Sequence, residues 1–211
     1  MGTSEQHLED LKEIRKMMEK SSRFLSLSGL SGIAAGLVAL AGAAIAFFVL
    51  GYPHRFFGPG EFYTGGAPRY TEIIPALMLD GIVMLVAALG FSYYFTRRRA
   101  LENGLPLWDE TTRRMLLAIT FPLVSGGIVC LIMIIQGLVF LVASLTLVFY
   151  GLALIAASQY TVKELKILGI SDAVLGLLAG VLPGYGLLFW AAGFGIFHII
   201  YGYRMYRKYE R

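Results

Sequence analysis

Three ionisable side chains lie inside long apolar stretches of the chain: Asp80, Asp172 and His198. Charged groups are costly at membrane depth. Where they occur, they usually face a bundle interior or a water-filled path and take part in ion or proton transfer. These three residues are therefore the candidate functional polar residues of the sequence.

Asp172 and His198 are predicted to lie at the same depth. Asp172 follows Lys166 by six residues, and His198 precedes Arg204 by six residues. A helical rise of about 1.5 Å per residue puts each about 9 Å into its apolar stretch. Because a turn near Gly184 would make their helices antiparallel, we expect an Asp172–His198 pair, either proton-exchanging or a static polar clamp. Asp80 has no evident partner in the sequence.

The third apolar stretch contains Pro122, followed by Ser125, Gly126 and Gly127. Proline removes one helical hydrogen bond, so this pattern predicts a kink or local unwinding. Interrupted helices form binding sites in many transporters. A kinked helix with only a packing role is the alternative.

Ser31 lies in a Gly-x-Ser-Gly string, eight residues after Arg23. That places it about 12 Å deep, near the depth of His198 and Asp172, so a hydrolase-like Ser–His–Asp arrangement is geometrically possible. A small-residue ladder for helix packing explains the same segment, and it consists of Ser28, Gly32 and Gly36. The sequence favours the ladder and predicts no catalytic residue.

The sequence predicts neither a metal site nor a cofactor. His7, His54 and His198 are far apart, so no metal-ligand spacing occurs. No glycine-rich loop with lysine could bind phosphate. Cys130 is the single cysteine, so it forms no internal disulfide and is expected to be a small packing residue.

The composition identifies an integral membrane protein. Of 211 residues, 57% are hydrophobic and 15% charged, with a mean hydropathy of +0.68. Soluble domains average about 45–50% apolar and about 25% charged residues. Apolar stretches of about 20 residues can each cross a bilayer. We predict an all-α bundle of six transmembrane helices, arranged as three hairpins, at 24–49, 73–95, 115–135, 138–157, 167–182 and 187–203.

The basic residues predict the orientation of the bundle. An even number of spans puts both termini on one side. Of the 18 basic residues, only Arg55 and Arg69 fall on the other side. The positive-inside rule therefore predicts cytoplasmic termini in the inner (plasma) membrane, an outer loop at 52-70 and a cytoplasmic loop at 97-114. The basic face predicts anionic lipid headgroups as partners and no nucleic acid. The sequence is also compatible with a homo-oligomer or with a membrane partner protein.

Residues 1-22 are predicted to form a cytoplasmic amphipathic helix ahead of the transmembrane domain at 23-211. Leu8, Leu11, Ile14 and Met18 recur at spacings of three and four. The helix either lies on the inner leaflet or docks another subunit. The segment is too acidic for a signal peptide, so we expect the first span to be retained.

The stretch 168–202 carries a Gly-rich ascending helix, a Pro-Gly turn and a descending helix, marked by Leu168-Gly169, Gly176-Leu177, Pro183-Gly184, Trp190, Gly193 and Tyr201-Gly202. This pattern resembles the HdeD-like acid-resistance membrane proteins. The resemblance implies six spans built from repeated two-helix units and an association with acid stress. It brings no catalytic motif to this chain.

We therefore expect a non-enzymatic inner-membrane protein with a stress-associated or accessory role. The second hypothesis is a small proton-coupled transporter or channel that uses Asp80 and the Asp172–His198 pair. The third hypothesis is an intramembrane serine hydrolase with Ser31 as its nucleophile.

Overall fold

A computed structural model describes residues 28–49, 70–104, 106–182 and 184–211. The predicted amphipathic helix at 1-22 and the outer loop up to residue 69 lie outside the described residues. The described chain is helical, with α2 (Gly29–Ala44), η1 (Ile45–Val49), α3 (Tyr70–Glu102), α4 (Glu110–Ile135), η3 (Val139–Leu141), α5 (Val142–Ala157), α6 (Lys163–Val181), α7 (Gly186–Trp190), η4 (Ala191–Phe197) and α8 (His198–Tyr209).

Five of these helices are long and apolar enough to cross a membrane: Gly29–Phe48, Ile74–Glu102, Glu110–Ile135, Val139–Ala157 and Gly186–Tyr209. The last of them combines α7, η4 and α8 and is called the last helix below. The structure thus confirms an all-helical bundle of membrane type. Helix α6 has 19 residues but carries Lys163, Glu164, Lys166 and Asp172, which lower its apolar character. The fifth predicted span, at 167–182 in α6, stays a prediction, and so does the total of six spans.

The connection between α3 and α4 is shorter than the predicted loop at 97-114. Helix α3 continues to Glu102, where an ion pair of 2.8 Å with Arg98 supports its last turn. Helix α4 already begins at Glu110, because Asp109 caps it by accepting the Thr112 backbone N–H at 2.7 Å. Charged residues thus extend both helices beyond their apolar stretches.

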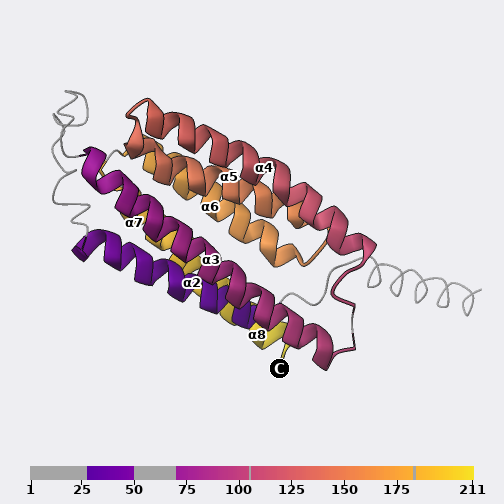
Figure 1. Ribbon diagram of the computed structural model, residues 1–211. Helices are drawn as coiled ribbons and strands as arrows, with labels where there is room; N and C mark the ends of the chain where they lie inside the picture. Colours follow the sequence, from indigo (N-terminus) through magenta and orange to yellow (C-terminus); the bar gives the residue numbers. More distant parts are fainter. Residues whose placement is uncertain (1–27, 50–69, 105, 183) are drawn as a thin grey trace, which may run out of the picture.

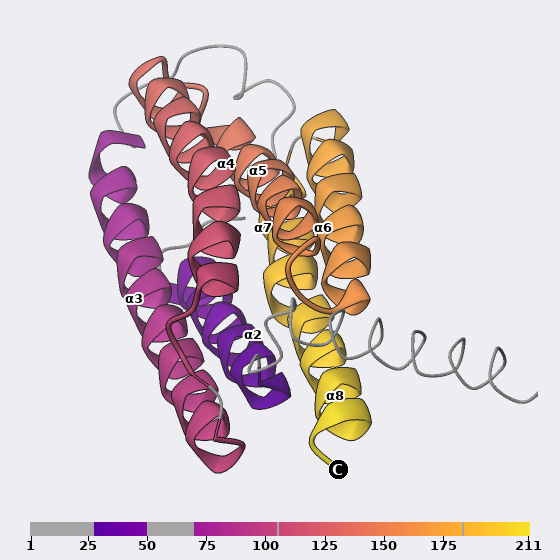
Figure 2. The ribbon, with the colours of Figure 1, turned by 90° about the vertical axis from the view of Figure 1, so that its right-hand side faces the viewer.

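The helices form two layers (Figure 1). Helices α4, α5 and α6 make one layer, and α2, α3 and the last helix make the other. Figure 2 shows the same arrangement from the side, with α3 at one edge and α6 at the other. A buried apolar cluster joins the layers near the C-terminus, formed by Met115, Leu154, Ala157, Val162, Leu165, Leu168 and Met205.

Within each layer, one pair of helices meets backbone to backbone at glycines. A Cβ on Gly151 of α5 would lie 2.5 Å from the carbonyl oxygen of Gly169 on α6. A Cβ on Gly202 of α8 would lie 2.5 Å from the carbonyl oxygen of Gly29 on α2. Such close crossings need residues without side chains. The closest pairs are therefore α5–α6 and α2–α8, which does not support three equivalent hairpins.

Helix α4 runs unbroken through the predicted interruption at Pro122. The Ser125 hydroxyl donates to the carbonyl oxygen of Phe121 at 2.7 Å, inside the same helix. The predicted local unwinding of α4 does not occur. Instead, π-helical turns interrupt the α-helical pattern at η1 and η4. Such turns are frequent at functional sites, so η4 is a candidate part of one.

Replacing Gly151 by alanine is expected to destabilise the protein. The added methyl group would overlap backbone atoms of α6, which cannot move without separating the two helices. Overpacking of this kind costs about 1–3 kcal/mol. The matched control is Gly90→Ala, because a Cβ on Gly90 would meet nothing within 4 Å. The melting temperature in detergent should be lowered for Gly151→Ala only. Equal melting temperatures of both variants would contradict the backbone contact.

Candidate functional site

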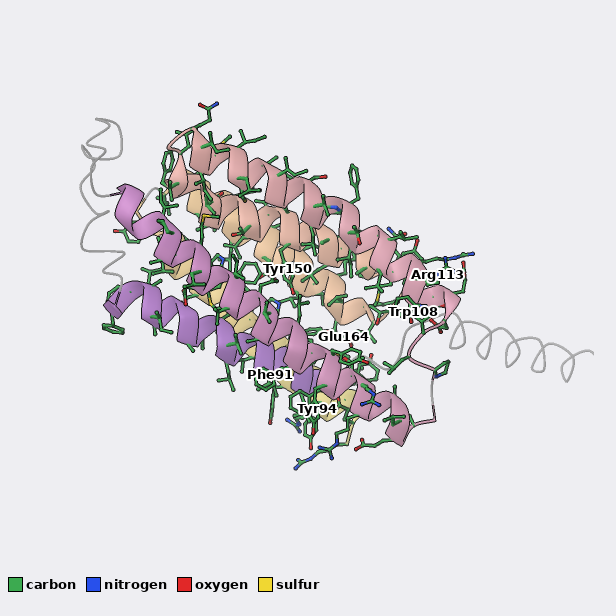
Figure 3. All side chains as sticks on the ribbon, viewed as in Figure 1. Phe91, Tyr94, Trp108, Arg113, Tyr150 and Glu164 are labelled. Atoms are coloured by element: carbon green, nitrogen blue, oxygen red, sulfur yellow. The ribbon has the colours of Figure 1, made fainter. Side chains whose placement is uncertain are left out.

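A cavity of about 590 Å³ lies between the two layers. Helices α2, α3, α4, α5 and the last helix line this interlayer cavity, and most of the lining side chains are apolar. Cys130 adds a thiol to the lining, and six side chains with nitrogen or oxygen atoms also line it: Asp80, Ser92, Thr146, Tyr150, Trp190 and His198. Volumes of about 300–1,000 Å³ with few polar groups are typical of small-molecule sites. Figure 3 shows Tyr150 between the layers.

His198 is held by two hydrogen bonds that determine its tautomer. Its Nδ1 lies 2.8 Å from the carbonyl oxygen of Gly193, and its Nε2 lies 2.8 Å from the hydroxyl of Tyr150. A carbonyl oxygen can only accept, so Nδ1 carries a proton. In the neutral ring Nε2 is then the acceptor, and Tyr150 donates to it. Both ring nitrogens are thus occupied by protein groups.

An aromatic ladder continues from His198 along the last helix. Phe194 stacks on His198 with ring centroids 5.9 Å apart and an interplanar angle of 16°. Trp190 lies one turn further, 4.8 Å from Phe194. Tyr150 of α5 packs against Phe194 at 4.8 Å and against His198 at 5.4 Å. Residues spaced by four share a helix face, so this signal was present in the sequence and was missed.

Asp172 is completely buried and does not line the cavity. Neither of its carboxyl oxygens has a hydrogen-bond partner in the described part of the chain. A Cβ on Gly193 would lie 2.9 Å from Asp172 Oδ1, and the carbonyl oxygen of this same Gly193 binds His198. Asp172 and His198 thus lie at similar depth, as predicted, and both are next to Gly193. The predicted direct pair is not formed, because His198 bonds to Gly193 and Tyr150.

Asp80 lines the interlayer cavity at a different level. Gly42 of α2 packs against Met84 of α3, and Gly36 packs against Ile199 of the last helix. Antiparallel counting from Gly42 and Met84 puts Asp80 opposite Ala46. His198 lies opposite Leu37 by the same counting, so about nine helical residues separate the two levels, which is about 14 Å. No described residue forms a hydrogen bond or ion pair with Asp80. The structure therefore does not bring Asp80 together with Asp172 and His198.

Ser31 is not part of a hydrolytic site among the described residues. Its hydroxyl donates to the backbone carbonyl oxygen of Ser28 at 2.5 Å, and no hydrogen bond joins it to His198. Its neighbours Gly32 and Gly36 lie at the close approach of α2 to the last helix. The segment has the geometry of a packing ladder.

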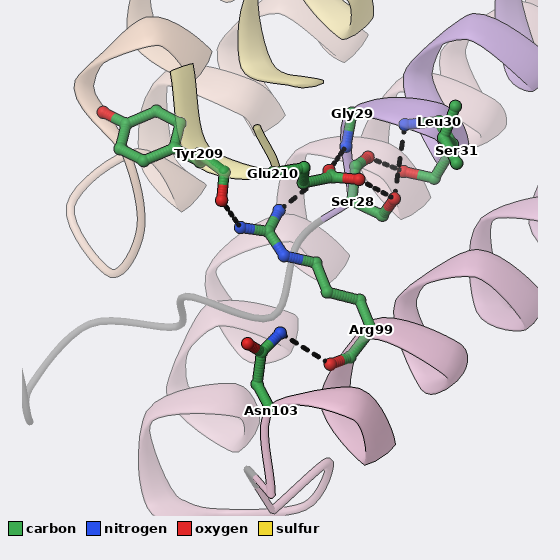
Figure 4. Close-up of polar contacts among 8 residues, drawn as sticks. All are labelled: Ser28, Gly29, Leu30, Ser31, Arg99, Asn103, Tyr209 and Glu210. Carbon is green, nitrogen blue, oxygen red and sulfur yellow. Dashed lines mark hydrogen bonds and ion pairs between the residues drawn. The ribbon is translucent and has the colours of Figure 1, made fainter. Parts of the chain in front are cut away.

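Sequence reasoning also missed a polar cluster at the C-terminal end of the bundle, the C-terminal clasp, formed by Ser28, Gly29, Arg99, Tyr209 and Glu210 (Figure 4). Arg99 of α3 donates to the Glu210 carboxylate at 3.0 Å and to the carbonyl oxygen of Tyr209 at 3.2 Å. The Glu210 carboxylate also accepts from the backbone N–H of Gly29 at the start of α2. A helix N-terminus favours such a carboxylate. The clasp connects three helices of one layer.

A second ionic contact connects the layers beside the C-terminal clasp. Glu164 of α6 pairs with Lys208 of α8 and accepts a hydrogen bond from the Tyr209 hydroxyl at 3.2 Å. Partial burial acts to raise the pKa of Glu164. The hydrogen bonds from Lys208 and Tyr209 outweigh this effect and leave the pKa below its usual value.

Comparison with known proteins finds no relative of this chain. No family model, no curated protein and no solved structure matches the chain. Among the described residues, no three His, Cys, Asp or Glu side chains are grouped so that they could hold a metal ion.

Stability should depend on pH through Glu164. A carboxyl whose pKa is lowered on folding contributes stability above its unfolded-state pKa, of about 4.3, and loses it as pH falls through the lower folded value. The pair is partly exposed, so we expect an effect of about 1 kcal/mol or less. Melting curves between pH 7 and pH 3 should show a smaller acid-induced decline in Glu164→Gln.

The control is Glu102→Gln, which removes an exposed carboxylate from the pair with Arg98 within α3. This variant should keep the wild-type acid-induced decline. An equal decline in Glu164→Gln and wild type would show that the contact between α6 and α8 contributes nothing.

Proposed function

We propose that this protein is a non-enzymatic integral membrane protein that binds a largely apolar molecule in the interlayer cavity. The observation that carries the proposal is the cavity itself, with its volume of about 590 Å³ and its largely apolar lining from both layers. The aromatic ladder and the Tyr150–His198 hydrogen bond give one wall a fixed shape. Rigid apolar walls with a few placed polar groups are suited to binding.

The bilayer is the proposed source of the bound molecule. The cavity is partly open, and α3 and α4 both line it. Helix α3 packs against α2 and leaves large apolar side chains exposed, such as Ile82 and Val86. Such a surface belongs in hydrocarbon. A molecule dissolved in the bilayer can therefore reach the cavity laterally, without crossing a polar surface.

The proposal includes six spans in the inner membrane with both termini in the cytoplasm. Helix α6 is the fifth span, because its charged residues Lys163, Glu164 and Lys166 occupy only its first turn and Asp172 is buried inside the bundle. The basic residues at that end would bind anionic lipid headgroups. A stress-associated or accessory role is supported only by the resemblance of residues 168–202 to HdeD-like proteins.

Binding can be followed with Trp190, which lines the cavity. The chain has two tryptophans, so Trp108→Phe leaves Trp190 as the only one. In lipid nanodiscs, a neutral spin-labelled alkane should quench Trp190 fluorescence. Filling the cavity with Gly127→Leu should reduce this quenching at least about twofold, because a side chain there enters open space.

The matched control is Gly90→Leu, which also adds a side chain in open space but does not line the cavity. It should leave quenching unchanged. Equal quenching in both variants and in their parent would contradict occupation of the cavity.

Proton-coupled transport is a second candidate function, and the buried carboxyl of Asp172 favours it. This carboxyl and His198 meet at Gly193 in the π-helical η4, and neither carboxyl oxygen has a described partner. Unpaired ionisable groups at membrane depth are typical of proton pathways.

Proteoliposomes provide the test of the second candidate. A proton gradient should drive proton uptake that is lost in Asp172→Asn and in His198→Ala. Asp109→Asn is the control, because Asp109 caps α4 outside the apolar stretches. Absence of flux in the wild type, or equal flux in all variants, would remove this candidate.

A further inference from the structure

Two hydroxyl groups of the interlayer cavity, those of Tyr150 and Thr146, present acceptors rather than donors. The Tyr150 hydroxyl uses its proton on His198 Nε2 at 2.8 Å. The Thr146 hydroxyl uses its proton on the carbonyl oxygen of Ala143 at 2.9 Å. In both cases the oxygen lone pairs remain available while the proton is engaged. His198 itself has no free ring nitrogen, because Nδ1 binds Gly193.

The described lining also carries an acidic side chain and no strongly basic one. Asp80 is its one carboxylate, and no lysine or arginine is present among the described residues that line the cavity. The described basic side chains are gathered instead towards the ends of the helices, as at Arg99 and Lys208. An anionic lipid or fatty acid would therefore find no counter-charge in the cavity.

The aromatic ladder adds a third feature that favours positive charge. Trp190 and Phe194 both line the cavity with rings 4.8 Å apart. Aromatic ring faces attract cations, tryptophan most strongly, and the attraction grows when water is excluded. A carboxylate, hydroxyl acceptors and aromatic rings in an apolar cavity form a binding surface for a cation with apolar substituents.

We propose that the interlayer cavity selects lipophilic cations, with Asp80 as the charged contact and the aromatic ladder as the apolar wall. This inference rests on the proposed function and names the chemical class of its ligand. The level of Asp80 lies about 14 Å along the helices from that of His198. The cavity can thus hold the positive group near Asp80 and an apolar body alongside Tyr150 and Phe194.

The experiment uses two probes of equal shape and opposite charge, tetraphenylphosphonium and tetraphenylborate. Binding to the full chain in nanodiscs is measured by equilibrium dialysis and corrected with empty nanodiscs of the same lipid. The cation should bind at least about tenfold more tightly than the anion, which corresponds to about 1.4 kcal/mol. Asp80→Asn should remove this preference, and Asp80→Glu should restore it.

Glu110→Gln is the matched control, because it removes an exposed carboxylate at the start of α4, away from the cavity. It should keep the preference for the cation. Equal affinity for both ions, or an unchanged preference in Asp80→Asn, would overturn the inference. If the neutral alkane still quenches Trp190 in that case, binding in the cavity stands and only the charge selectivity fails. If the alkane also fails to quench Trp190, the proposed function fails together with the charge selectivity.

Discussion

Backbone contact at glycines is the constraint on which the rest of the bundle depends. Gly151 and Gly169 bring α5 against α6, and Gly29 and Gly202 bring α2 against α8. No side chain fits into either crossing, so the larger side chains of these helices must point elsewhere. Tyr150, next to Gly151, extends between the layers. Tight packing within the layers and bulky rings between them together leave the interlayer cavity open.

Polar contacts connect the described helices at the C-terminal end of the bundle. At the C-terminal end, the C-terminal clasp joins α2, α3 and α8, and the contact of Glu164 with Lys208 joins α8 to α6. The apolar cluster around Leu165 and Met205 adds packing there. Asp80 lies away from these contacts and lines the interlayer cavity. The structure thus combines one fixed end with a cavity that starts beyond it.

The apolar stretches predicted where the helices lie. They did not predict which side chains contact one another. Hydropathy ended the second span at Phe95, whereas charged residues continue α3 to Glu102. Depth counting placed Asp172 and His198 level, but it carries no information on rotation about the helix axes. Tyr150 therefore took the hydrogen bond that had been assigned to Asp172. The contact of Ser28 with Glu210 joins residues 182 positions apart, a separation at which local patterns predict nothing. The aromatic ladder, by contrast, was readable from its spacing of four.

We propose that the two layers enclose a space that a molecule from the bilayer occupies. A structure determined in lipid nanodiscs tests this most directly. We expect α3 to stay apart from α4 and α5, with non-protein density in the cavity against Tyr150 and Phe194. Helix α3 packed onto α4, with side chains filling the space and no such density, would contradict it.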